Sequence, residues 1–349
     1  MFMKSIKDFD VVGKRVLVRC DFNVPVDEKG NILDDFRIKE ILPTIKYLLG
    51  KNAKIILMSH LGEPGGKAVD ILKLDKVQQS LEKLLDMDII KSRDCIGKET
   101  EELSLSLKEG EVLLLENLRF YKEEMENDKN FTEDLSKMGE IYVNEAFGVD
   151  HRSHASLVGV PKFLPACAGF LLEKEIENLN KVLNSPQKPM VAIVGGTKVE
   201  TKSKFIDKIS KVADFVIISG LIKKEIVEKN VQFEFPEKII GPIDSLGALD
   251  IDEKTIEIFR EKILHAKTIV WNGPFGKFEE KEYEKGTLAI AKAIIESKAF
   301  SVIGGGETVE FITKHGLMEK FSHVSTGGGA MIAYLSGDQL PGLVPLEQN

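Results

Sequence analysis

Cysteine is scarce in this chain of 349 residues, and Cys20, Cys95 and Cys167 lie far apart without forming a CxxC pair. We expect free thiols in a reducing compartment, which excludes a disulfide framework and a cysteine-bound zinc. The sequence also lacks any apolar run near the roughly 18 residues that a membrane span requires, and its first residues lack the apolar core of a signal peptide. We therefore expect a cytoplasmic protein with no membrane partner.

Arginine is the second shortage, since the chain holds 41 lysines but only 7 arginines and has a formal net charge of −8. Nucleic-acid binders are more often basic, so no nucleic-acid partner is expected. The planar fork of arginine suits carboxylates and phosphates, whereas lysine mainly aids solubility. Each arginine is therefore a candidate for a binding role.

Short apolar runs rich in β-branched residues alternate with segments of helical periodicity, and no short repeat or low-complexity tract interrupts them. The expected strands are 15–20, 54–59, 112–117, 141–147, 190–196, 214–220, 267–273, 300–306 and 322–328. Helical segments include 38–49, 77–85 and 171–183. This alternation predicts an α/β fold of mostly parallel β-sheets flanked by helices. Because the chain is too long for one compact core, we expect two Rossmann-like domains, 1–170 and 185–335, joined by a connector helix at 171–184 and a hinge.

Four expected strands of the second half end in glycine-rich segments: VGGTK (194–198), WNGPFGKFE (271–279), GGGET (304–308) and STGGGA (325–330). Neither a Walker GxxxxGK[ST] loop nor a GxGxxG motif occurs. Backbone N–H groups in such turns, followed by a helix start, favour anions and most often phosphate. One glycine triplet alone could be a tight turn, but four such strand ends in one domain favour a phosphate site.

Charged residues accompany these turns. Lys198 and Lys202 are four apart and share a face if 198–209 is helical, although a solvated lysine face is the alternative. Glu279 and Glu307 could orient a sugar hydroxyl or Mg²⁺, or could be acids that the helix dipole favours.

In the first half, four arginines stand at strand ends or beside polar loops: Arg19, Arg37, Arg119 and Arg152. Asp21 and Asn23 follow Arg19, His60 ends an expected strand, and His151 and His154 flank Arg152. HxxH without a third ligand is poor support for a metal. Salt bridges to surface acids are the alternative for the arginines, but together the group predicts a basic pocket for a small anion of several charges.

One domain is thus expected to hold a nucleotide-like phosphate chain and the other a small anionic substrate. Phosphoryl transfer between them needs alignment and charge stabilisation more than covalent chemistry. Two half-sites would also have to close around a hinge to exclude water.

At these residues the sequence resembles the phosphoglycerate kinase family nearly end to end. The matching segments of the first half are RVLVRCDFNVPVD, DDFRIKEILPTI, MSHLGEP, LLLENLRFY, YVNEAFGVDHRSHASLVG and KFLPACAGFLLEKEIENL. Those of the second half are VAIVGGTKVETK, KTIVWNGPFGKFE, GGGETV, VSTGGGA and LPG. The resemblance implies transfer between 1,3-bisphosphoglycerate and ADP with Mg²⁺, giving 3-phosphoglycerate and ATP. It also implies a 3-phosphoglycerate domain at 1–170, with the tail 336–349 packing back on it, a nucleotide domain at 185–335, and a monomer.

The resemblance also implies roles for individual residues. Those expected to hold 3-phosphoglycerate are Arg19, Asp21, Asn23, Arg37, His60, Arg119 and Arg152. Arg37 and Lys202 would stabilise the transferring phosphoryl group, together with the N–H groups of Gly327, Gly328 and Gly329. The nucleotide would contact Gly195, Gly196, Lys198, Lys202, Asn272, Pro274, Glu279, Gly304, Gly305, Gly306 and Thr308. Glu307 would organise Mg²⁺.

Four departures from the family pattern stand out. Glu63 occupies a position where the family usually has arginine, and Glu145 and Glu307 replace aspartates. Segment 219–250 lacks a glycine-rich loop and several dozen residues that line the adenine pocket in the family. The alternative function is therefore a diverged protein of little turnover that binds an anion or nucleotide for regulation or scaffolding.

Overall fold

The computed structural model describes residues 3–244 and 246–347 and divides into two compact units. One unit comprises Met1–Glu175 together with Gln339–Asn349, and the other comprises Ile176–Asp338. Within the described ranges, no helix is both long and apolar enough to cross a membrane.

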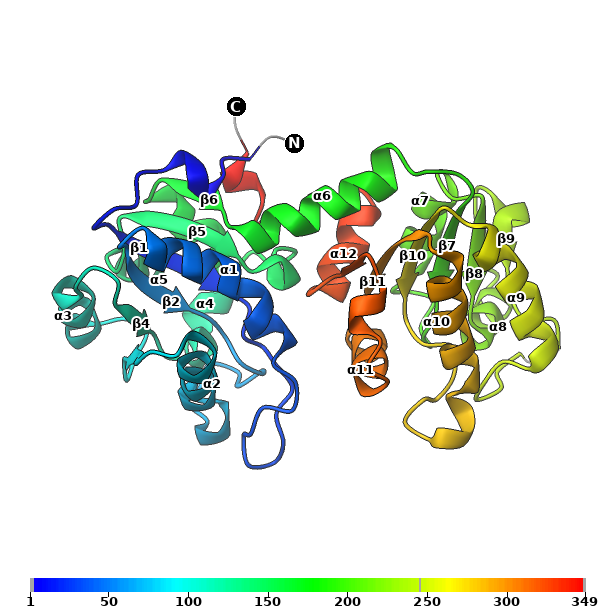
Figure 1. Cartoon of the computed structure of the whole chain (residues 1–349), viewed down its shortest axis with the longest axis horizontal. Coiled ribbons are helices and arrows are strands. Elements are labelled where there is room, and N and C mark those ends of the chain that lie inside the picture. The colour runs from blue at the N-terminus through cyan, green and yellow to red at the C-terminus, as the bar shows by residue number, and fades with distance from the viewer. Residues whose placement is uncertain (1–2, 245, 348–349) are drawn as a thin grey trace. The chain divides into compact units, whose positions relative to one another are not determined.

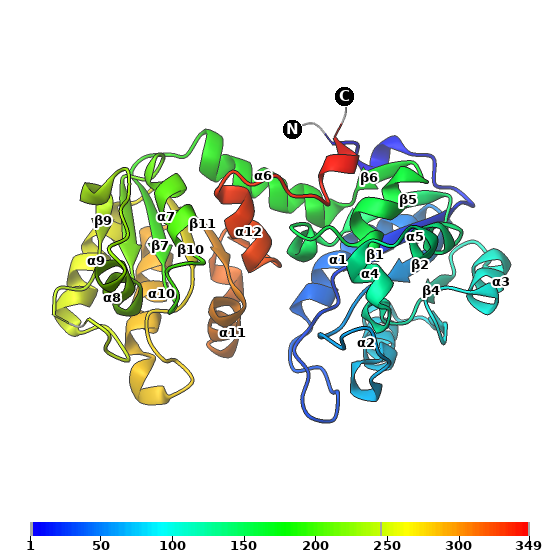
Figure 2. The same cartoon turned by 180° about the vertical axis from the view of Figure 1, so that it is seen from behind.

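The first unit is a parallel sheet with helices on both faces (Figures 1 and 2). Its strands are β1 (Arg15–Cys20), β2 (Lys54–Met58), β3 (Ile90–Lys91), β4 (Val112–Leu114), β5 (Ile141–Glu145) and β6 (Ala166–Ala168), in the order β3-β4-β2-β1-β5-β6. Its helices are α1 (Phe36–Gly50), α2 (Asp75–Leu85), α3 (Lys98–Ser106), α4 (Lys122–Glu126), α5 (Lys129–Ser136) and the start of α6 (Phe170–Asn184).

Alternation along β1 decides which side chains enter the core and which reach the site. Val16, Val18 and Cys20 share one hydrophobic cluster with residues of α1 and α2. Side chains of a strand alternate between the faces, so Arg19 points to the opposite face. That face carries α4, labelled in Figure 2, and the π-helical turn Ala155–Gly159, because Glu124 and Ser156 of these elements contact Arg19.

The second unit repeats this plan with a sheet ordered β12-β11-β10-β7-β8-β9, again parallel throughout. Its strands are β7 (Met190–Val194), β8 (Phe215–Ile218), β9 (Ile239–Ile240), β10 (Thr268–Asn272), β11 (Phe300–Gly304) and β12 (His323–Val324). Its helices are α7 (Ser203–Ser210), α8 (Gly220–Glu228), α9 (Glu253–His265), α10 (Lys285–Ser297), α11 (Gly306–Lys314) and α12 (Gly328–Leu335). The predicted α/β class with two parallel sheets flanked by helices is confirmed.

In each sheet the chain starts at a central strand, fills one side of the sheet, and then continues on the other side. In the second sheet each side is filled outward, whereas in the first the edge strand β3 comes before β4, which lies between β3 and β2. The strand order reverses between β1 and β5 in the first unit and between β7 and β10 in the second. Open parallel sheets bind ligands at the carboxyl ends of their strands beside such a reversal. Ligand sites are therefore expected at these two edges.

Some sequence expectations need correction. β3, β6 and β9, of two or three residues each, were absent from the expected strands. Lys198 and Lys202 do not share a helix, because α7 begins only at Ser203. The tail meets the first unit, where Gly342 N donates to Asp150 O at 2.9 Å and Asn144 Nδ2 donates to Gly342 O at 3.2 Å. The assignment of a substrate to each domain stays a prediction.

Candidate functional sites at the strand ends

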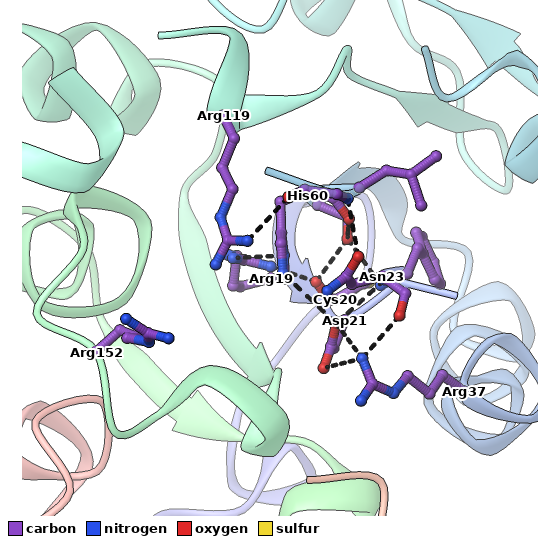
Figure 3. Close-up of polar contacts among 12 residues, drawn as sticks. Arg19, Cys20, Asp21, Asn23, Arg37, His60, Arg119 and Arg152 are labelled. Atoms are coloured by element: carbon purple, nitrogen blue, oxygen red, sulfur yellow. Dashed lines mark hydrogen bonds and ion pairs between the residues drawn. The ribbon is translucent and has the colours of Figure 1, made fainter. Parts of the chain in front are cut away.

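The first unit gathers most of the predicted anion-binding residues at the carboxyl ends of adjacent strands. Figure 3 shows Arg19, Asp21, Asn23, Arg37, His60, Arg119 and Arg152 around one region. Arg19, Asp21 and Asn23 lie at the end of β1 or just after it, His60 follows β2, and Arg119 follows β4. Arg152 comes from the loop beyond β5, and Arg37 comes from the first turn of α1. The predicted cluster is thus brought together by the sheet order.

Arg19 is fully buried and organises the floor of this cluster. Its Nε donates to Ser156 Oγ at 2.6 Å, and its Nη2 lies 3.2 Å from His60 Nδ1 and 3.9 Å from Glu124 Oε1. Glu124 is also fully buried and accepts from the Ser156 backbone N–H at 2.9 Å. A buried arginine needs such partners because an unpaired charge in the core is costly.

The contact with Arg19 fixes the state of His60. A guanidinium can only donate, so His60 Nδ1 accepts and the ring proton sits on Nε2. Burial, and next the Arg19 charge, lower the pKa of His60 well below its usual range, so the ring is neutral at pH 7. Nε2 makes no hydrogen bond within the described residues and lies 3.9 Å from Asp21 Oδ1. His60 therefore presents an uncharged donor to the cluster.

Asp21 and Asn23 hold Arg37 in place. Arg37 Nη1 lies 3.2 Å from Asp21 Oδ2 and donates to the Asn23 carbonyl at 2.8 Å. Asn23 Oδ1 accepts from the backbone N–H of Gly62 at 2.8 Å. Arg37 is thus oriented on one side, and its side chain remains 28% exposed for contact with a ligand.

Arg119 is buried at the end of β4 and is paired with Glu63. Its Nη1 donates to Glu63 Oε1 at 2.6 Å and to the Gly62 carbonyl at 3.0 Å, whereas its Nε makes no hydrogen bond within the described residues. Burial lowers the pKa of Arg119, and the Glu63 carboxylate opposes that effect. Arg152 is exposed, and its Nε donates to His151 Nε2 at 3.1 Å.

In the second unit, close backbone packing accounts for several glycines. A Cβ on Gly195 would lie 2.2 Å from the Gly273 carbonyl oxygen, and one on Gly328 would lie 2.4 Å from Gly305 Cα. Gly305 also has a φ of +106°, which L side chains rarely adopt. The two glycine triplets therefore meet backbone to backbone and bring the N-termini of α11 and α12 together.

Other glycines remain open for a ligand. A Cβ on Gly196 or Gly306 would meet nothing within 4 Å. Gly306 and Gly328 are the first residues of α11 and α12, so both helix starts direct free N–H groups to the same edge of the sheet.

The other predicted glycines differ in their surroundings. A Cβ on Gly304 would lie 2.6 Å from Met331 Sδ, so this position is closed by packing. Gly327 is buried and Gly329 is exposed.

Lys202 is the cation beside these helix starts. Its Nζ donates to Oδ1 of the buried Asn272, whose Nδ2 has no hydrogen-bond partner among the described residues. Burial lowers the pKa of Lys202 to about 8, while the nearby Glu307 carboxylate acts in the opposite direction. The site thus holds one partly buried amine, one exposed carboxylate and two helix N-termini.

The remaining predicted nucleotide residues differ in their surroundings. Thr308 is buried and its hydroxyl accepts from the Gly273 backbone N–H at 2.8 Å, so it fixes the turn after β10. Pro274 is buried in the same turn, where its carbonyl accepts from Gly196 N–H at 2.9 Å. Lys198 and Glu279 are exposed in loops. Their side chains are therefore accessible from solvent.

No described group of three or more His, Cys, Asp or Glu residues has the arrangement of a metal site. Glu307 alone supplies an exposed oxygen donor in the first turn of α11, close enough to affect Lys202. Mg²⁺ is often bound by one or two carboxylates together with substrate phosphates. Glu307 fits an ion that arrives with a phosphate chain better than it fits a resident ion.

Sequence reasoning missed the buried polar residues that hold the first cluster. Asn117 accepts from the backbone N–H groups of Leu61 and Arg119 at 3.3 and 3.0 Å, and its Nδ2 donates to the Leu61 carbonyl at 2.8 Å. Ser156 Oγ accepts from Arg19 Nε and donates to Glu124 Oε1, so these two residues hold Arg19 in place. The polar end of the expected strand 112–117 gave a signal for Asn117, but Glu124 lies between the other acids of a short helix, Glu123 and Glu126, and nothing nearby marks it.

Comparisons with known proteins agree with these arrangements. A family model described as phosphoglycerate kinase matches residues 6–234 and 227–338. The phosphoglycerate kinases of Dictyoglomus turgidum and Borrelia hermsii are 44% identical over 390 aligned residues and 41% over 393, covering 98% and 100% of both chains. These alignments are longer than the chain itself, so the relatives hold residues that have no counterpart here.

Solved structures give the same result. The phosphoglycerate kinase of Pyrococcus horikoshii OT3 has a TM-score of 0.89 and 34% identity, covering 99% of this chain and 98% of that one. That of Coxiella burnetii has a TM-score of 0.83 and 30% identity with the same coverage. With matches in sequence and structure along nearly its whole length, the chain belongs to the phosphoglycerate kinase family.

Proposed function

We propose that this chain is an active phosphoglycerate kinase that moves a phosphoryl group between 1,3-bisphosphoglycerate and ADP, giving 3-phosphoglycerate and ATP. Family membership over the full length supports the activity. The observation that carries the mechanism is the pair of anion sites: an arginine cluster ends one sheet, and two helix starts beside Lys202 end the other. The comparisons give no support to the alternative of a binding protein with little turnover.

The arginine cluster is the proposed 3-phosphoglycerate site. Arg119, Arg152 and the neutral His60 would bind the anionic groups, with Asp21 and Asn23 receiving hydroxyl or water protons and orienting Arg37. Arg19 is fully buried, so its contribution would come through the position of His60 and the charge it lends to the pocket. The unpartnered Arg119 Nε and His60 Nε2 support this assignment, because buried donors in native proteins normally have a partner.

Arg37 and Lys202 are the proposed catalytic residues. In-line phosphoryl transfer concentrates negative charge on the equatorial oxygens and demands alignment. Arg37 would supply a rigid cation from the acceptor side, and Lys202 would supply one from the nucleotide side. The N–H groups of Gly327, Gly328 and Gly329 would add fixed dipoles.

The nucleotide is proposed to lie along the carboxyl edge of the second sheet. Lys198 and the open glycines Gly196 and Gly306 would meet phosphates, and Glu279 would bind the ribose. The turns that present them depend on close packing or hydrogen bonding by Gly195, Gly304, Gly305, Thr308, Asn272 and Pro274. When Mg²⁺ is bound, it neutralises charge on the phosphates, and Glu307 would hold it.

The mechanism requires both substrates to meet in the absence of water, so we propose that the domains expected from the sequence, 1–170 and 185–335, close around the connector helix 171–184 during catalysis. The tail 336–349 would stay with the first unit. The proposal also includes a monomeric protein in the cytoplasm, with Mg²⁺ as the metal.

The decisive assay is ATP- and Mg²⁺-dependent phosphorylation of 3-phosphoglycerate by purified protein. Lys202→Ala should lower kcat by about 10²–10³-fold, as expected for loss of one fixed charge at a transition state. Lys208→Ala is the matched control, since Lys208 is exposed on α7 and makes no described side-chain contact. Absence of turnover by the unaltered chain at saturating substrates would refute the activity.

A further inference from the structure

The Glu63–Arg119 ion pair is a feature that the reaction itself does not require. We propose that Glu63 is a built-in competitor for Arg119, which an anionic acceptor must displace, and that it thereby sets the acceptor affinity of this chain. The inference rests on the proposed function of the arginine cluster as the acceptor site. It assigns to Glu63 an affinity-setting role rather than a structural one.

The pair is unequal in burial. The side chain of Arg119 is 3% exposed, whereas that of Glu63 is 71% exposed. In a buried structural ion pair both partners are shielded from solvent, and the attraction between them offsets the hydration that each has lost. Here only the arginine has a fixed place, and the carboxylate reaches it from solvent. The Glu63 side chain can therefore leave without exposing any core.

The backbone that carries Glu63 is held independently of this ion pair. Gly62 N–H donates to Asn23 Oδ1 at 2.8 Å, and the Gly62 carbonyl accepts from Arg119 Nη1 at 3.0 Å. Gly62 also has a φ of +66° and packs against Leu72 so closely that a Cβ would lie 2.8 Å away. When the carboxylate leaves, Arg119 keeps its bond to Gly62 and its orientation. Glu63 is thus a movable side chain on a fixed support.

The positive charge around Arg119 favours an incoming phosphate over the Glu63 carboxylate. Arg19 and Arg152 add positive charge near Arg119, while Glu63 and Asp21 add negative charge. If the Glu63 carboxylate leaves, three arginines remain to attract an incoming anion, and Asp21 opposes these three positive charges. A dianionic phosphate can use all of them, together with the unpartnered Arg119 Nε, whereas a single carboxylate on Nη1 cannot. Because Glu63 acts on the free site, its removal should improve acceptor binding and leave the chemical step almost unaltered.

The test compares Glu63→Gln with Glu109→Gln, which removes the same charge from the opposite edge of the sheet. Glu109 is exposed before β4 and lies beside Gly13, which precedes β1. Calorimetric titration of each protein with inorganic sulfate and with 3-phosphoglycerate, without nucleotide, measures the site directly. We expect Glu63→Gln to tighten both by about 3–30-fold and to lower KM for 3-phosphoglycerate with kcat within about twofold. Glu109→Gln should change neither.

A second variant separates contact from long-range charge. Glu63→Asp keeps the charge but is one methylene shorter, so we expect it to tighten sulfate less than Glu63→Gln. The advantage of Glu63→Gln should shrink as ionic strength rises. Unaltered or weaker sulfate binding by Glu63→Gln, or an equal gain from Glu109→Gln, would overturn the proposal. Sulfate titration decides this even if the chain shows no turnover, which would count against the proposed function instead.

Discussion

The close packing of the two glycine triplets predicts different effects for alanine at Gly306 and at Gly328. Gly306 and Gly328 each begin a helix, so changing either to alanine adds the same methyl group at the same helical position. The methyl on Gly306 would meet nothing within 4 Å, whereas that on Gly328 would lie 2.4 Å from Gly305 Cα and 2.5 Å from Gly305 N. Backbone cannot rotate away as a side chain can. The two variants should therefore differ in the sign of their effect.

Gly328→Ala should lower the free energy of unfolding of the second unit by about 1–3 kcal/mol, the usual cost of overpacking. Gly306→Ala should leave it unaltered or raise it by up to about 1 kcal/mol, since alanine restricts the unfolded chain. Trp271 is the chain's only tryptophan and is fully buried in β10, so its fluorescence in guanidinium reports the second unit separately. Separation of α12 from α11 should also weaken nucleotide binding in Gly328→Ala. Equal unfolding midpoints for the two variants would refute the packing argument.

Two further predictions concern pH. Burial lowers the pKa of Lys202 to about 8, so kcat/KM for nucleotide should fall as pH rises through 8 and the ammonium loses its proton. Lys202→Arg should abolish this fall at alkaline pH, because arginine stays protonated. Lys198→Ala should retain it. Burial raises the pKa of Asp150 to about 7, so between pH 4 and 7 the folded chain holds a proton that the unfolded chain releases, and the stability contributed by this group declines as pH rises through that window. Asp150→Asn should consequently stabilise the first unit by on the order of 1–4 kcal/mol at pH 8 and much less at pH 4, measured by urea unfolding; equal gains at both pH values would contradict this.

The strands that sequence reasoning found and missed differ in the source of their stability. β1 (RVLVRC) and β7 (MVAIV) are buried on both faces and hold mostly apolar residues with several valines or isoleucines, so composition marks them. β3, β6 and β9 hold only two or three residues, too few to show a period. They form because a neighbouring strand offers unpaired backbone groups, and their paired residues lie 23 or 24 positions away in the sequence, beyond the reach of a local pattern. Edge strands of this kind depend on tertiary structure.

The sequence predicted which residues gather in the first cluster but not which contacts join them. Arginines, a histidine and polar residues after strands were visible because parallel sheets gather strand ends at one edge. The pairing of Arg19 with Ser156 and Glu124 was not visible, because it joins residues more than a hundred positions apart across one face of the sheet. Equally, the Glu63 position was noticed as a charge change, but its contact with Arg119 follows only from the fold of the Gly62 turn.

The strongest indications of function are the groups that lower the stability of the fold and have no structural role that would explain their presence. Glycine at positions 195, 273 and 328 would be required by close packing, and at position 305 by its φ of +106°, even if no ligand ever bound. These residues are therefore weaker indicators of catalysis than the sequence suggested. Lys202 is different, because a partly buried ammonium with a lowered pKa is a cost to folding, and the oxygen of Asn272 compensates it only in part. The unpartnered Arg119 Nε and His60 Nε2 are costs of the same kind. Such groups lie at the carboxyl ends of both sheets, where a phosphorylated ligand would supply the missing contacts, and this coincidence ties the two sites to phosphoryl transfer more firmly than the glycine motifs do.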